Sequence, residues 1–366
     1  MPVALSDRHA IFSKATQLNR EFAMEKYTVS NDPNIYEAWP DVTLTPEGKL
    51  VCVFSECTHH KNRDYTRIML CESADRGRTW SPKHPLTEGT ANLDYYYNCA
   101  RIGMLKDDRM YVIVDKVPRQ ISNGSGEKNT SAMAKNLIYF SDDFGATWQN
   151  PVLTPLKGIV PDRLLELDNG RWIISAHHHV EGNLVQFMHY SEDHGNSWSK
   201  KITVASKKGL NLCEVSILPV DNDTLVAFLR ENSMLGYDCM KTISNDNGET
   251  WGEVINFPLP GCHRPVARYL NDGQIFITHR FVQGGKGWLG TWTQNFFGAF
   301  TDTASVLAET RNEAWTRIFP IDFDRSSKSD LGYSGHVQFP DGEIYVVNYI
   351  VDDAVDKGQI RGYSFY

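Results

Sequence analysis

The sequence predicts an all-β chain that folds as one six-bladed β-propeller of four-stranded antiparallel blades. Two internal repeats carry this prediction. An octet with the pattern S-x-D-x-G-x-[TS]-W occurs four times, at intervals of 68, 50 and 53 residues: 73–80, 141–148, 191–198 and 244–251. An apolar strand, a tight turn and a second apolar strand recur six times. Repeats of this size are typical of propeller blades or solenoid units.

The octet has the chemistry of a hairpin turn. In its first copy, Asp75 can accept hydrogen bonds from backbone N–H groups of its own loop, and Gly77 can adopt a positive φ. The hydroxyl of Thr79 can close the turn, and Trp80 supplies a large apolar anchor with one N–H to satisfy. Each octet is therefore expected at an outer hairpin, away from the central axis.

The six strand–turn–strand units define the blades. Their turns place Asp, Asn or Gly between β-rich runs, which is a strong hairpin signal: Gly48, Asp108, Asn169–Gly170, Asn222–Asp223, Asp272–Gly273 and Asp341–Gly342. In the first four units the octet follows the turn by some 19 to 35 residues, where the next hairpin of the same unit belongs. Two hairpins make a four-stranded blade, and radial closure of the blades limits exposed strand edges.

The whole chain, residues 1–366, is predicted to form a single domain. The N-terminal segment 1–35 contains a strand-like run, and the final residues 359–366 also have the pattern of a strand. We expect the N-terminal strand to join the last blade and close the ring. The fifth and sixth units lack the octet, and residues 282–330 are expected to form an elaborated loop region.

The composition argues against two kinds of partner. A net charge of −8 disfavours nucleic acid and provides no basic patch for an anionic membrane. The sequence contains no run of about 18 apolar residues that would span a membrane. The N-terminus does not resemble a secretion signal, and the seven scattered cysteines lack CxxC spacing. We therefore expect a cytoplasmic protein with free, buried thiols.

The positions of the turns also predict a functional site. The first strand of each blade is innermost and its neighbour returns antiparallel, so the start of one and the end of the other lie together near the axis. Counting nine residues back from each turn gives Trp39, Cys99, Pro161, Glu214, Arg264 and Tyr333. The second strands end near Glu56, Asp115, His177, Arg230, His279–Arg280 and Asn348–Tyr349. Buried charges need partners, so the reactive members of these sets predict a polar pocket at the channel mouth: Glu214, Arg230, Arg264 and Tyr333.

The octets are similar to Asp boxes, and residues 36–350 resemble the sialidase superfamily of six-bladed propellers. Tyr333, in Gly332-Tyr-Ser-Gly before a Pro-Asp-Gly turn, looks like the nucleophile of that family. Glu214, in Asn-Leu-Cys-Glu214-Val-Ser, looks like the carboxylate beside it. A tyrosine is a poor nucleophile until a base takes its proton, and sialidases use such a tyrosine.

The resemblance extends to substrate binding and proton transfer. Arg230, and Arg264 in Cys-His-Arg264-Pro, are similar to two arginines of the clamp that holds a substrate carboxylate through bidentate hydrogen bonds. Asp64, after the first hairpin, is similar to the acid/base residue. The resemblance implies a retaining exo-glycosidase that acts on a carbohydrate and needs no cofactor.

The sequence departs from the family at one place. Sialidases open the first blade with a further clamp arginine in an Arg-Ile-Pro motif, where this chain has Ala38-Trp39-Pro40. The glutamate that supports that arginine is replaced by Asn348. Trp39 is expected to place an indole in the pocket, where a sugar ring could stack. The substrate is therefore expected to be an acidic terminal sugar other than standard sialic acid.

Further polar residues are expected near the same face. Arg101 and Arg163 begin inner strands and are either pocket residues or structural partners of Asp41 and Asp162. Histidines at strand ends, including His59, His60 and His177, are expected to contact sugar hydroxyls and not a metal, which would need about three converging ligands.

Two other functions remain open from the sequence. A histidine and tyrosine pair could perform β-elimination on a uronic acid, as in propeller-shaped polysaccharide lyases, although only fold analogy supports this. The pocket could also bind sugars without turnover. The sequence leaves the oligomeric state open.

Overall fold

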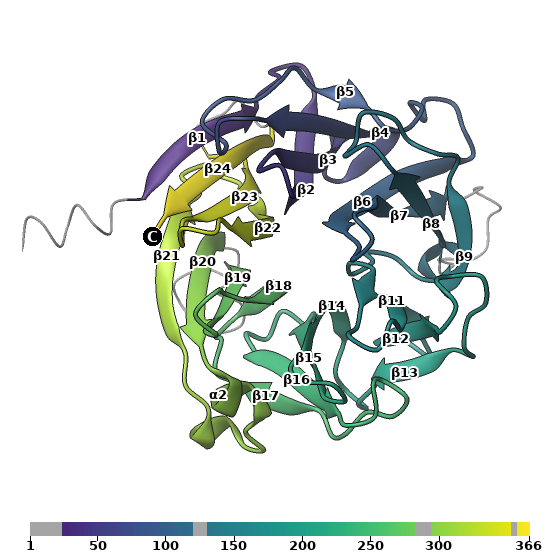
Figure 1. Ribbon diagram of the computed structural model, residues 1–366, viewed down its shortest axis with the longest axis vertical. Coiled ribbons are helices and arrows are strands. Elements are labelled where there is room, and N and C mark those ends of the chain that lie inside the picture. Colours follow the sequence, from purple (N-terminus) through teal and green to yellow (C-terminus); the bar gives the residue numbers. More distant parts are fainter. Residues whose placement is uncertain (1–23, 120–129, 283–293, 353–356) are drawn as a thin grey trace, which may run out of the picture.

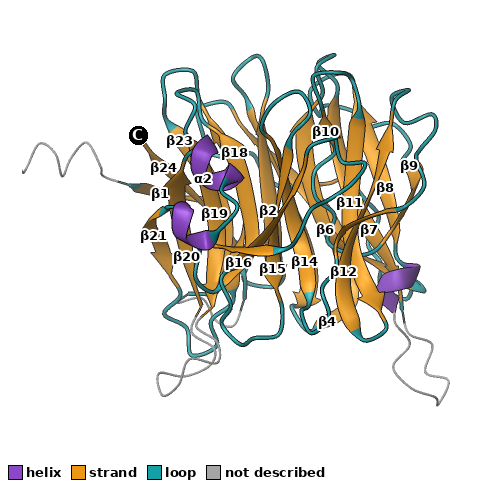
Figure 2. Ribbon diagram, turned by 90° about the horizontal axis from the view of Figure 1, so that it is seen from below, coloured by secondary structure: helices purple, strands orange, loops and turns teal. Residues whose placement is uncertain are grey.

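The structure is a computed structural model that describes residues 24–119, 130–282, 294–352 and 357–366. Six antiparallel sheets of four strands each are arranged around a central axis (Figure 1). The predicted all-β, six-bladed propeller is therefore confirmed. The strands run between the two faces of the ring, so each blade contributes loops to both faces (Figure 2).

The first three blades follow one another along the chain. Blade one consists of β2 (Tyr36–Leu44), β3 (Leu50–His59), β4 (Asn62–Ser73) and β5 (His84–Pro85). Blade two consists of β6 (Tyr95–Met104), β7 (Met110–Pro118), β8 (Lys135–Ser141) and β9 (Val152–Lys157), with the 3-10 helix η1 (Thr130–Met133) before β8. Blade three consists of β10 (Leu165–Glu166), β11 (Trp172–Val180), β12 (Asn183–Ser191) and β13 (Ile202–Ala205).

The last three blades complete the ring. Blade four consists of β14 (Leu212–Pro219), β15 (Leu225–Glu231), β16 (Cys239–Ser244) and β17 (Ile255–Phe257). Blade five consists of β18 (Cys262–Tyr269), β19 (Ile275–Val282), β20 (Gln294–Thr301) and β21 (Arg317–Phe323). Blade six consists of β22 (Leu331–Gln338), β23 (Ile344–Ile350), β24 (Gln359–Phe365) and β1 (Glu25–Ser30). Strand β1 pairs antiparallel with β24, so the two ends of the described chain share the last blade.

Each octet connects the third and fourth strands of its blade. In the first copy the Ser73 hydroxyl donates to Asp75 at 2.8 Å, and Asp75 accepts from the backbone N–H of Thr79 at 2.9 Å. The Thr79 hydroxyl also donates to Asp75, at 2.6 Å, and these hydrogen bonds lower the pKa of Asp75 to about 2. Gly77 has a φ of 84°, which only glycine adopts without strain. The octets therefore act as hairpin turns, as the sequence predicts.

The region expected to be an elaborated loop, 282–330, is largely regular structure. It contains the two outer strands of blade five, β20 and β21, with the short helix α2 (Thr303–Leu307) and the 3-10 helix η2 (Arg311–Glu313) between them. The run Phe296-Phe-Gly-Ala-Phe300 pairs along its length with β19. A blade can thus be completed without an octet, because aromatic side chains supply its apolar faces. Residues 283–293 lie outside the described part of the chain.

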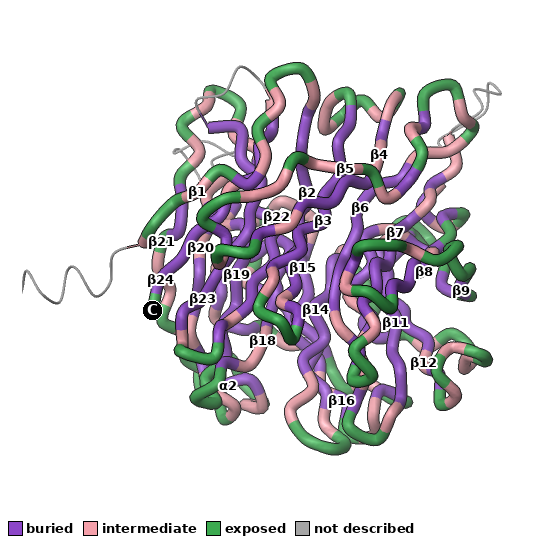
Figure 3. The backbone as a smooth tube through the Cα atoms, turned by 45° about the horizontal axis from the view of Figure 1, so that its top comes forward, coloured by how far each residue is buried: buried purple, intermediate pink, exposed green. Residues whose placement is uncertain are grey.

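The core lies between neighbouring blades. Buried side chains of blade one, such as Val51 and Leu70, pack against Ile102 and Val112 of blade two. The tube in Figure 3 is accordingly buried along the inner strands and exposed at the turns. The seven cysteines are all buried and unpaired, as expected from their apolar surroundings. In the described residues, no helix is long and apolar enough to cross a membrane.

The innermost strands are edge strands, and side chains of the preceding blade accept hydrogen bonds from their free backbone N–H groups. The carboxylate of Asp41 accepts from the backbone N–H of Ile102 at 3.1 Å, and Asp162 accepts from Ile217 at 2.8 Å. Such groups need partners because an unpaired buried N–H is costly. These side chains therefore join consecutive blades around the channel.

Candidate active site

The innermost strands carry bulges near the channel mouth. In blade one, Ala38 pairs with Ser55 and Asp41 with Val53, so two residues oppose one. The same shift occurs in blades two, four, five and six, and a comparable irregularity follows the Ile159–His177 bridge in blade three. The ring positions predicted by counting from the turns all fall in these irregularities: Trp39, Cys99, Pro161, Glu214, Arg264 and Tyr333.

The bulges turn side chains toward the axis. Trp39, Glu214 and Arg264 have positive φ values of 55°, 51° and 51°, which are strained for residues with a side chain. In blade six the equivalent position is Gly332, with a φ of 98°. A Cβ there would lie 2.5 Å from the Cβ of Arg280, so only glycine fits. Tyr333 follows as the second bulge residue. Bulges of this kind often re-aim side chains next to active sites.

The centre of the site is a buried cluster of three residues. The Tyr333 hydroxyl donates a hydrogen bond to Oε1 of Glu214. The same oxygen accepts from Nη1 of Arg230 at 2.8 Å, and that nitrogen lies 3.5 Å from the Tyr333 oxygen. The sequence predicted that these three residues would meet, and the structure brings them together.

Electrostatics assign the proton within this cluster. Burial alone would raise the pKa of Glu214, but the charges of Arg230 and Arg264 outweigh it and lower the pKa to about 2. Burial and the charge of Glu214 raise the pKa of Tyr333 well above its ordinary value, against the opposing charge of Arg230. The resting site therefore holds an ionised carboxylate and a protonated phenol.

Two further arginines flank the tyrosine ring, but only one faces the cleft. The guanidinium groups of Arg280 and Arg264 lie 5.0 Å and 5.6 Å from the ring centroid. Arg280 lines the cleft. Arg264 is only 1% exposed, does not line the cleft and donates to the backbone oxygen of Pro161 at 3.1 Å. On the cleft wall, the place expected for Arg264 is thus taken by Arg280, which the sequence identified only as the end of a strand.

A cleft of about 1080 Å³ opens above this cluster. Its wall includes polar residues from blades one, four, five and six: Tyr36, His59, His60, Arg230, Arg280, Asp330 and Tyr333. The cleft is large enough for a sugar unit and part of its aglycone.

Asp330 organises one side of the cleft, although no pattern in the sequence selects it. Its carboxylate accepts from the hydroxyls of Tyr36 and Tyr349, the latter at 2.7 Å, and contacts Nδ1 of His60. Nη2 of Arg280 lies 3.7 Å away. Burial would raise the pKa of Asp330, but the hydrogen bond and charge of His60, followed by the charge of Arg280, lower it strongly.

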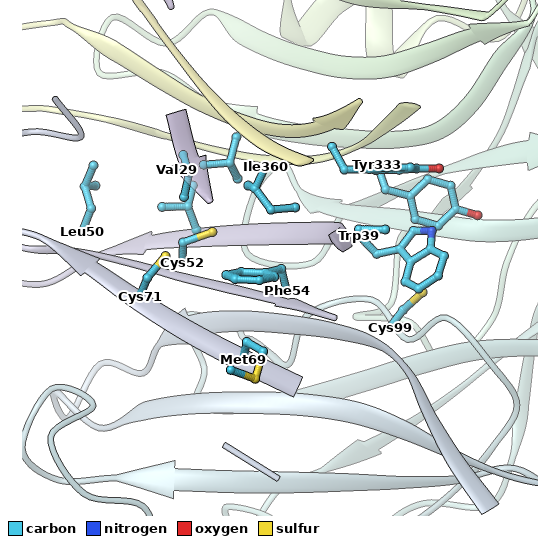
Figure 4. Close-up of a cluster of buried hydrophobic side chains, with 14 of the residues drawn as sticks. Val29, Trp39, Leu50, Cys52, Phe54, Met69, Cys71, Cys99, Tyr333 and Ile360 are labelled. Atoms are coloured by element: carbon cyan, nitrogen blue, oxygen red, sulfur yellow. The ribbon is translucent and has the colours of Figure 1, made fainter. Parts of the chain in front are cut away.

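Trp39 is not an open platform for a sugar ring, contrary to the expectation from the sequence. It is 3% exposed, and the guanidinium of Arg63 covers its ring at 3.8 Å from the centroid. The ring of His60 meets it edge-on at 5.4 Å. Figure 4 shows Trp39 next to Tyr333 and Cys99 at one end of a buried cluster. The β3–β4 hairpin packs over the indole, so Trp39 does not line the cleft.

Asp64 does not line the cleft. It follows Arg63 on β4, and consecutive strand residues point to opposite faces. Since Arg63 points inward onto Trp39, Asp64 points away, and it is exposed. Its backbone oxygen accepts from Arg119 at 3.0 Å.

Arg101 and Arg163 have the structural role that the sequence left open. Their guanidinium groups lie 3.4 Å and 3.2 Å from the carboxylate of Asp41, away from the cleft. His177 is also structural, because its Nδ1 accepts from the backbone N–H of Glu214 at 3.3 Å and so supports the bulge. Burial lowers the pKa of His177 to about 3. Among the described residues, no group of three or more His, Cys, Asp or Glu is placed to hold a metal ion.

The fold and site together define a six-bladed propeller of the sialidase type, with Asp-box turns and a polar cluster at the channel mouth. The BNR repeat-like domain family matches residues 120–346, more than half of the chain, and the protein belongs to this family. No curated protein matches the sequence.

Solved structures of similar fold include sialidases. A protein of unknown function from Dyadobacter fermentans is 19% identical with a TM-score of 0.72, over 93% of this chain and 97% of that one. The Hadza microbial sialidase Hz136 is 15% identical with a TM-score of 0.70, over 93% and 68% of the two chains. The intramolecular trans-sialidase of Ruminococcus gnavus is 15% identical with a TM-score of 0.62, over 90% and 94%. At these identities the likeness concerns the fold.

Proposed function

We propose that this protein is an exo-glycosidase of the sialidase superfamily that removes a terminal acidic sugar with retention of configuration. The observation that carries the proposal is the hydrogen bond from Tyr333 to Glu214, with Arg230 on the same oxygen. A base beside a phenol is what a tyrosine nucleophile requires. Two arginines on the cleft wall, Arg230 and Arg280, supply the positive charge that would attract a sugar carboxylate.

The mechanism follows from the proton positions. The oxygen of Tyr333 attacks the anomeric carbon while Glu214 takes the phenolic proton and the glycosidic bond breaks. An acid in the cleft gives its proton to the leaving oxygen. In the second step that group takes a proton from water, which attacks the same carbon, and Glu214 returns its proton to Tyr333. Two displacements retain the configuration. The charges of Arg264 and Arg280 beside the ring stabilise the departing phenolate.

We assign proton donation to His60. His60 lines the cleft, and the contact of its Nδ1 with Asp330 orients the ring. Nε2 is then the ring nitrogen that would give its proton to the leaving oxygen. Asp64, which the family resemblance favours, lies on the same hairpin but outside the cleft wall. A comparison of the two variants therefore tests the assignment.

The substrate is proposed to be a sugar acid other than standard sialic acid. Ala38, at the place of the first clamp arginine, is fully buried, and Asn348 accepts from the backbone N–H of Gly332 at 2.8 Å. Neither residue offers a cationic contact to a ligand. The carboxylate would accordingly be held by Arg230 and Arg280.

The test is a screen of terminal glycosides of 2-keto sugar acids and of hexuronic acids. Release of an intact reducing sugar supports hydrolysis. An unsaturated product that absorbs in the ultraviolet would instead identify a uronate lyase, and saturable binding without any product would identify a binding module.

A further inference from the structure

A second group of charges, some buried and some partly buried, lies at the other end of the central channel and has no part in the proposed mechanism. Arg101, Arg163 and Arg268 approach the carboxylate of Asp41 to 3.4, 3.2 and 3.3 Å. They line an opening of about 230 Å³ together with Asp162. The remaining wall includes the last residues of β14 and β18, whereas the cleft is reached from the first residues of the inner strands. The two openings therefore lie at opposite ends of the axis.

The two carboxylates in this group are already engaged by the backbone. Asp41 accepts from the N–H of Ile102, and Asp162 accepts from the N–H of Ile217. Asp41 is also fixed in place, because a Cβ at Gly335 would lie 1.9 Å from its Oδ1. Three guanidinium groups thus face two carboxylates that cannot turn freely toward them.

Two donor groups in the opening are left without acceptors. Nη2 of Arg163 and Nε of Arg268 are buried and have no hydrogen-bond partner within the described part of the chain. Nε of Arg101 also makes no hydrogen bond, but it lies 3.4 Å from the carboxylate of Asp41. Arg101 itself is only 3% exposed. A buried donor without an acceptor costs free energy, and a buried charge costs more unless it is paired. Burial lowers the pKa of Arg101 to about 10, and the charges of Arg264 and Arg163 add to this against the opposing charge of Asp41.

We propose that this opening binds a small oxyanion, such as phosphate, sulfate or a carboxylate. The forked donors of arginine match the geometry of oxyanions. Apolar wall residues, including Leu165, Pro219 and Val266, strengthen the attraction by lowering the local dielectric. At ~30 Å³ for each water molecule, the volume holds several waters that an oxyanion can displace.

Binding at this place also has a structural consequence. Asp41 belongs to blade one, Arg101 to blade two and Arg268 to blade five. An anion that bonds to these arginines connects inner strands from different sides of the ring. It therefore stabilises the closed propeller, and its binding is measurable without knowledge of the sugar substrate.

The experiment measures the thermal midpoint of the full chain against phosphate, sulfate and acetate, with sodium chloride used to keep the ionic strength constant. We expect a saturable rise with at least one anion, and the three titrations distinguish inorganic oxyanions from a carboxylate. Arg163→Gln and Arg268→Gln should each raise the half-saturating concentration at least tenfold. Arg109→Gln, which alters a partly exposed arginine paired with Asp107, is the matched control and should respond as the wild type does.

A second control separates this opening from the cleft. Arg280→Gln removes a cleft arginine and should leave the anion response intact. Loss of the response in Arg280→Gln but not in Arg163→Gln would overturn the proposal, as would a rise that never saturates or no rise at all. If Arg163→Gln does not fold, Arg163→Lys can be used instead. Lysine keeps the positive charge but lacks the forked guanidinium donors, so anion binding should still weaken. Crystals grown with the preferred anion should show it within hydrogen-bond distance of Nη2 of Arg163.

Discussion

Tyr333 and Glu214 are 119 residues apart in the sequence and belong to blades six and four, yet the hydroxyl of Tyr333 donates to the carboxylate of Glu214 across the channel mouth. The contact forms because each residue occupies a bulge of an innermost strand, which turns its side chain toward the axis. Arg230 fixes the carboxylate from the end of its own hairpin. The pair is a protonated phenol with an ionised carboxylate already in contact.

Removal of the phenolic oxygen tests the nucleophile. Tyr333→Phe keeps the ring and its packing but removes the atom that is proposed to attack the anomeric carbon. We expect kcat to fall by at least ~10³-fold while binding of the sugar acid is retained. The measurements are release of reducing sugar and calorimetric binding. A fully active Tyr333→Phe enzyme would contradict the mechanism.

Counting back from the turns in the sequence predicts the residues around the channel mouth. It succeeds because the inner hairpins have a nearly constant length, so the bulges fall at the same distance from each turn. The choice between neighbouring residues could not be predicted in this way. Arg280 faces the cleft and Arg264 does not, because the bulge changes the register between β18 and β19. In the same way, a shift between Cys57 and His59 sets which residue of β4 points inward.

Asp330 is a second cleft residue that could not be predicted from the sequence. It lies before β22, outside any repeat, and its importance comes from side chains that different blades bring to it. Tyr36 belongs to blade one and Arg280 to blade five. Only the closed ring brings these groups together, so no local pattern predicts the cluster.

Arg280 is expected to recognise the substrate carboxylate. Arg280→Gln removes the charge but keeps a polar side chain on the cleft wall, and a charge-assisted hydrogen bond contributes about 3 kcal/mol at most. We therefore predict that kcat/KM for an acidic sugar falls about 100-fold, and that the neutral amide of the same sugar loses far less. Steady-state kinetics on the two substrates measure the difference. An equal loss for both would assign Arg280 a structural role.

The leaving group distinguishes His60 from Asp64 as proton donor. Without its acid, the enzyme should fail on an alkyl or sugar leaving group but still cleave an activated aryl glycoside, whose leaving oxygen needs little protonation. We expect this selective loss, about 100-fold on the poor leaving group, for His60→Gln. Asp64→Asn should stay close to the wild type on both substrates. The reverse pattern would return the role to Asp64.

His177 should make stability depend on acidity. Its folded pKa is about 3, lowered chiefly by burial, whereas an unfolded histidine titrates near 6.5. The unfolded chain thus binds a proton that the folded chain does not, so stability is complete above pH ~6.5 and is lost as the pH falls toward 3.

The variant His177→Gln removes this one titration and keeps an acceptor for the N–H of Glu214. Between pH ~3 and pH ~6.5, the free energy of unfolding of this variant should fall less steeply with decreasing pH than that of the wild type. The two slopes should differ by about 1.4 kcal/mol per pH unit. Urea denaturation at several pH values measures the slope, which does not depend on how stable the variant is at neutral pH. Parallel slopes for the two proteins would exclude His177 as a source of the acid sensitivity.

Gly332 and Gly342 form a matched pair that tests how the bulge supports Tyr333. Their φ values are 98° and 99°, so replacement by alanine strains the backbone equally, at about 1–2 kcal/mol. A Cβ at Gly342 meets nothing within 4 Å, but one at Gly332 lies 2.5 Å from the Cβ of Arg280. Gly332→Ala should therefore lose about 2 kcal/mol more than Gly342→Ala.

Activity should separate the same two variants more sharply. Relief of the clash at Gly332 requires β22 to move away from β19, which separates Tyr333 from Arg280 and from Glu214. A shift of about 1 Å in a reacting group can cost ~10²-fold in rate, so Gly332→Ala should be nearly inactive below its melting temperature. Gly342→Ala, at the far turn of the same hairpin, should keep the wild-type kcat. If both variants are equally active while folded, the close packing of Gly332 on Arg280 does not position the nucleophile.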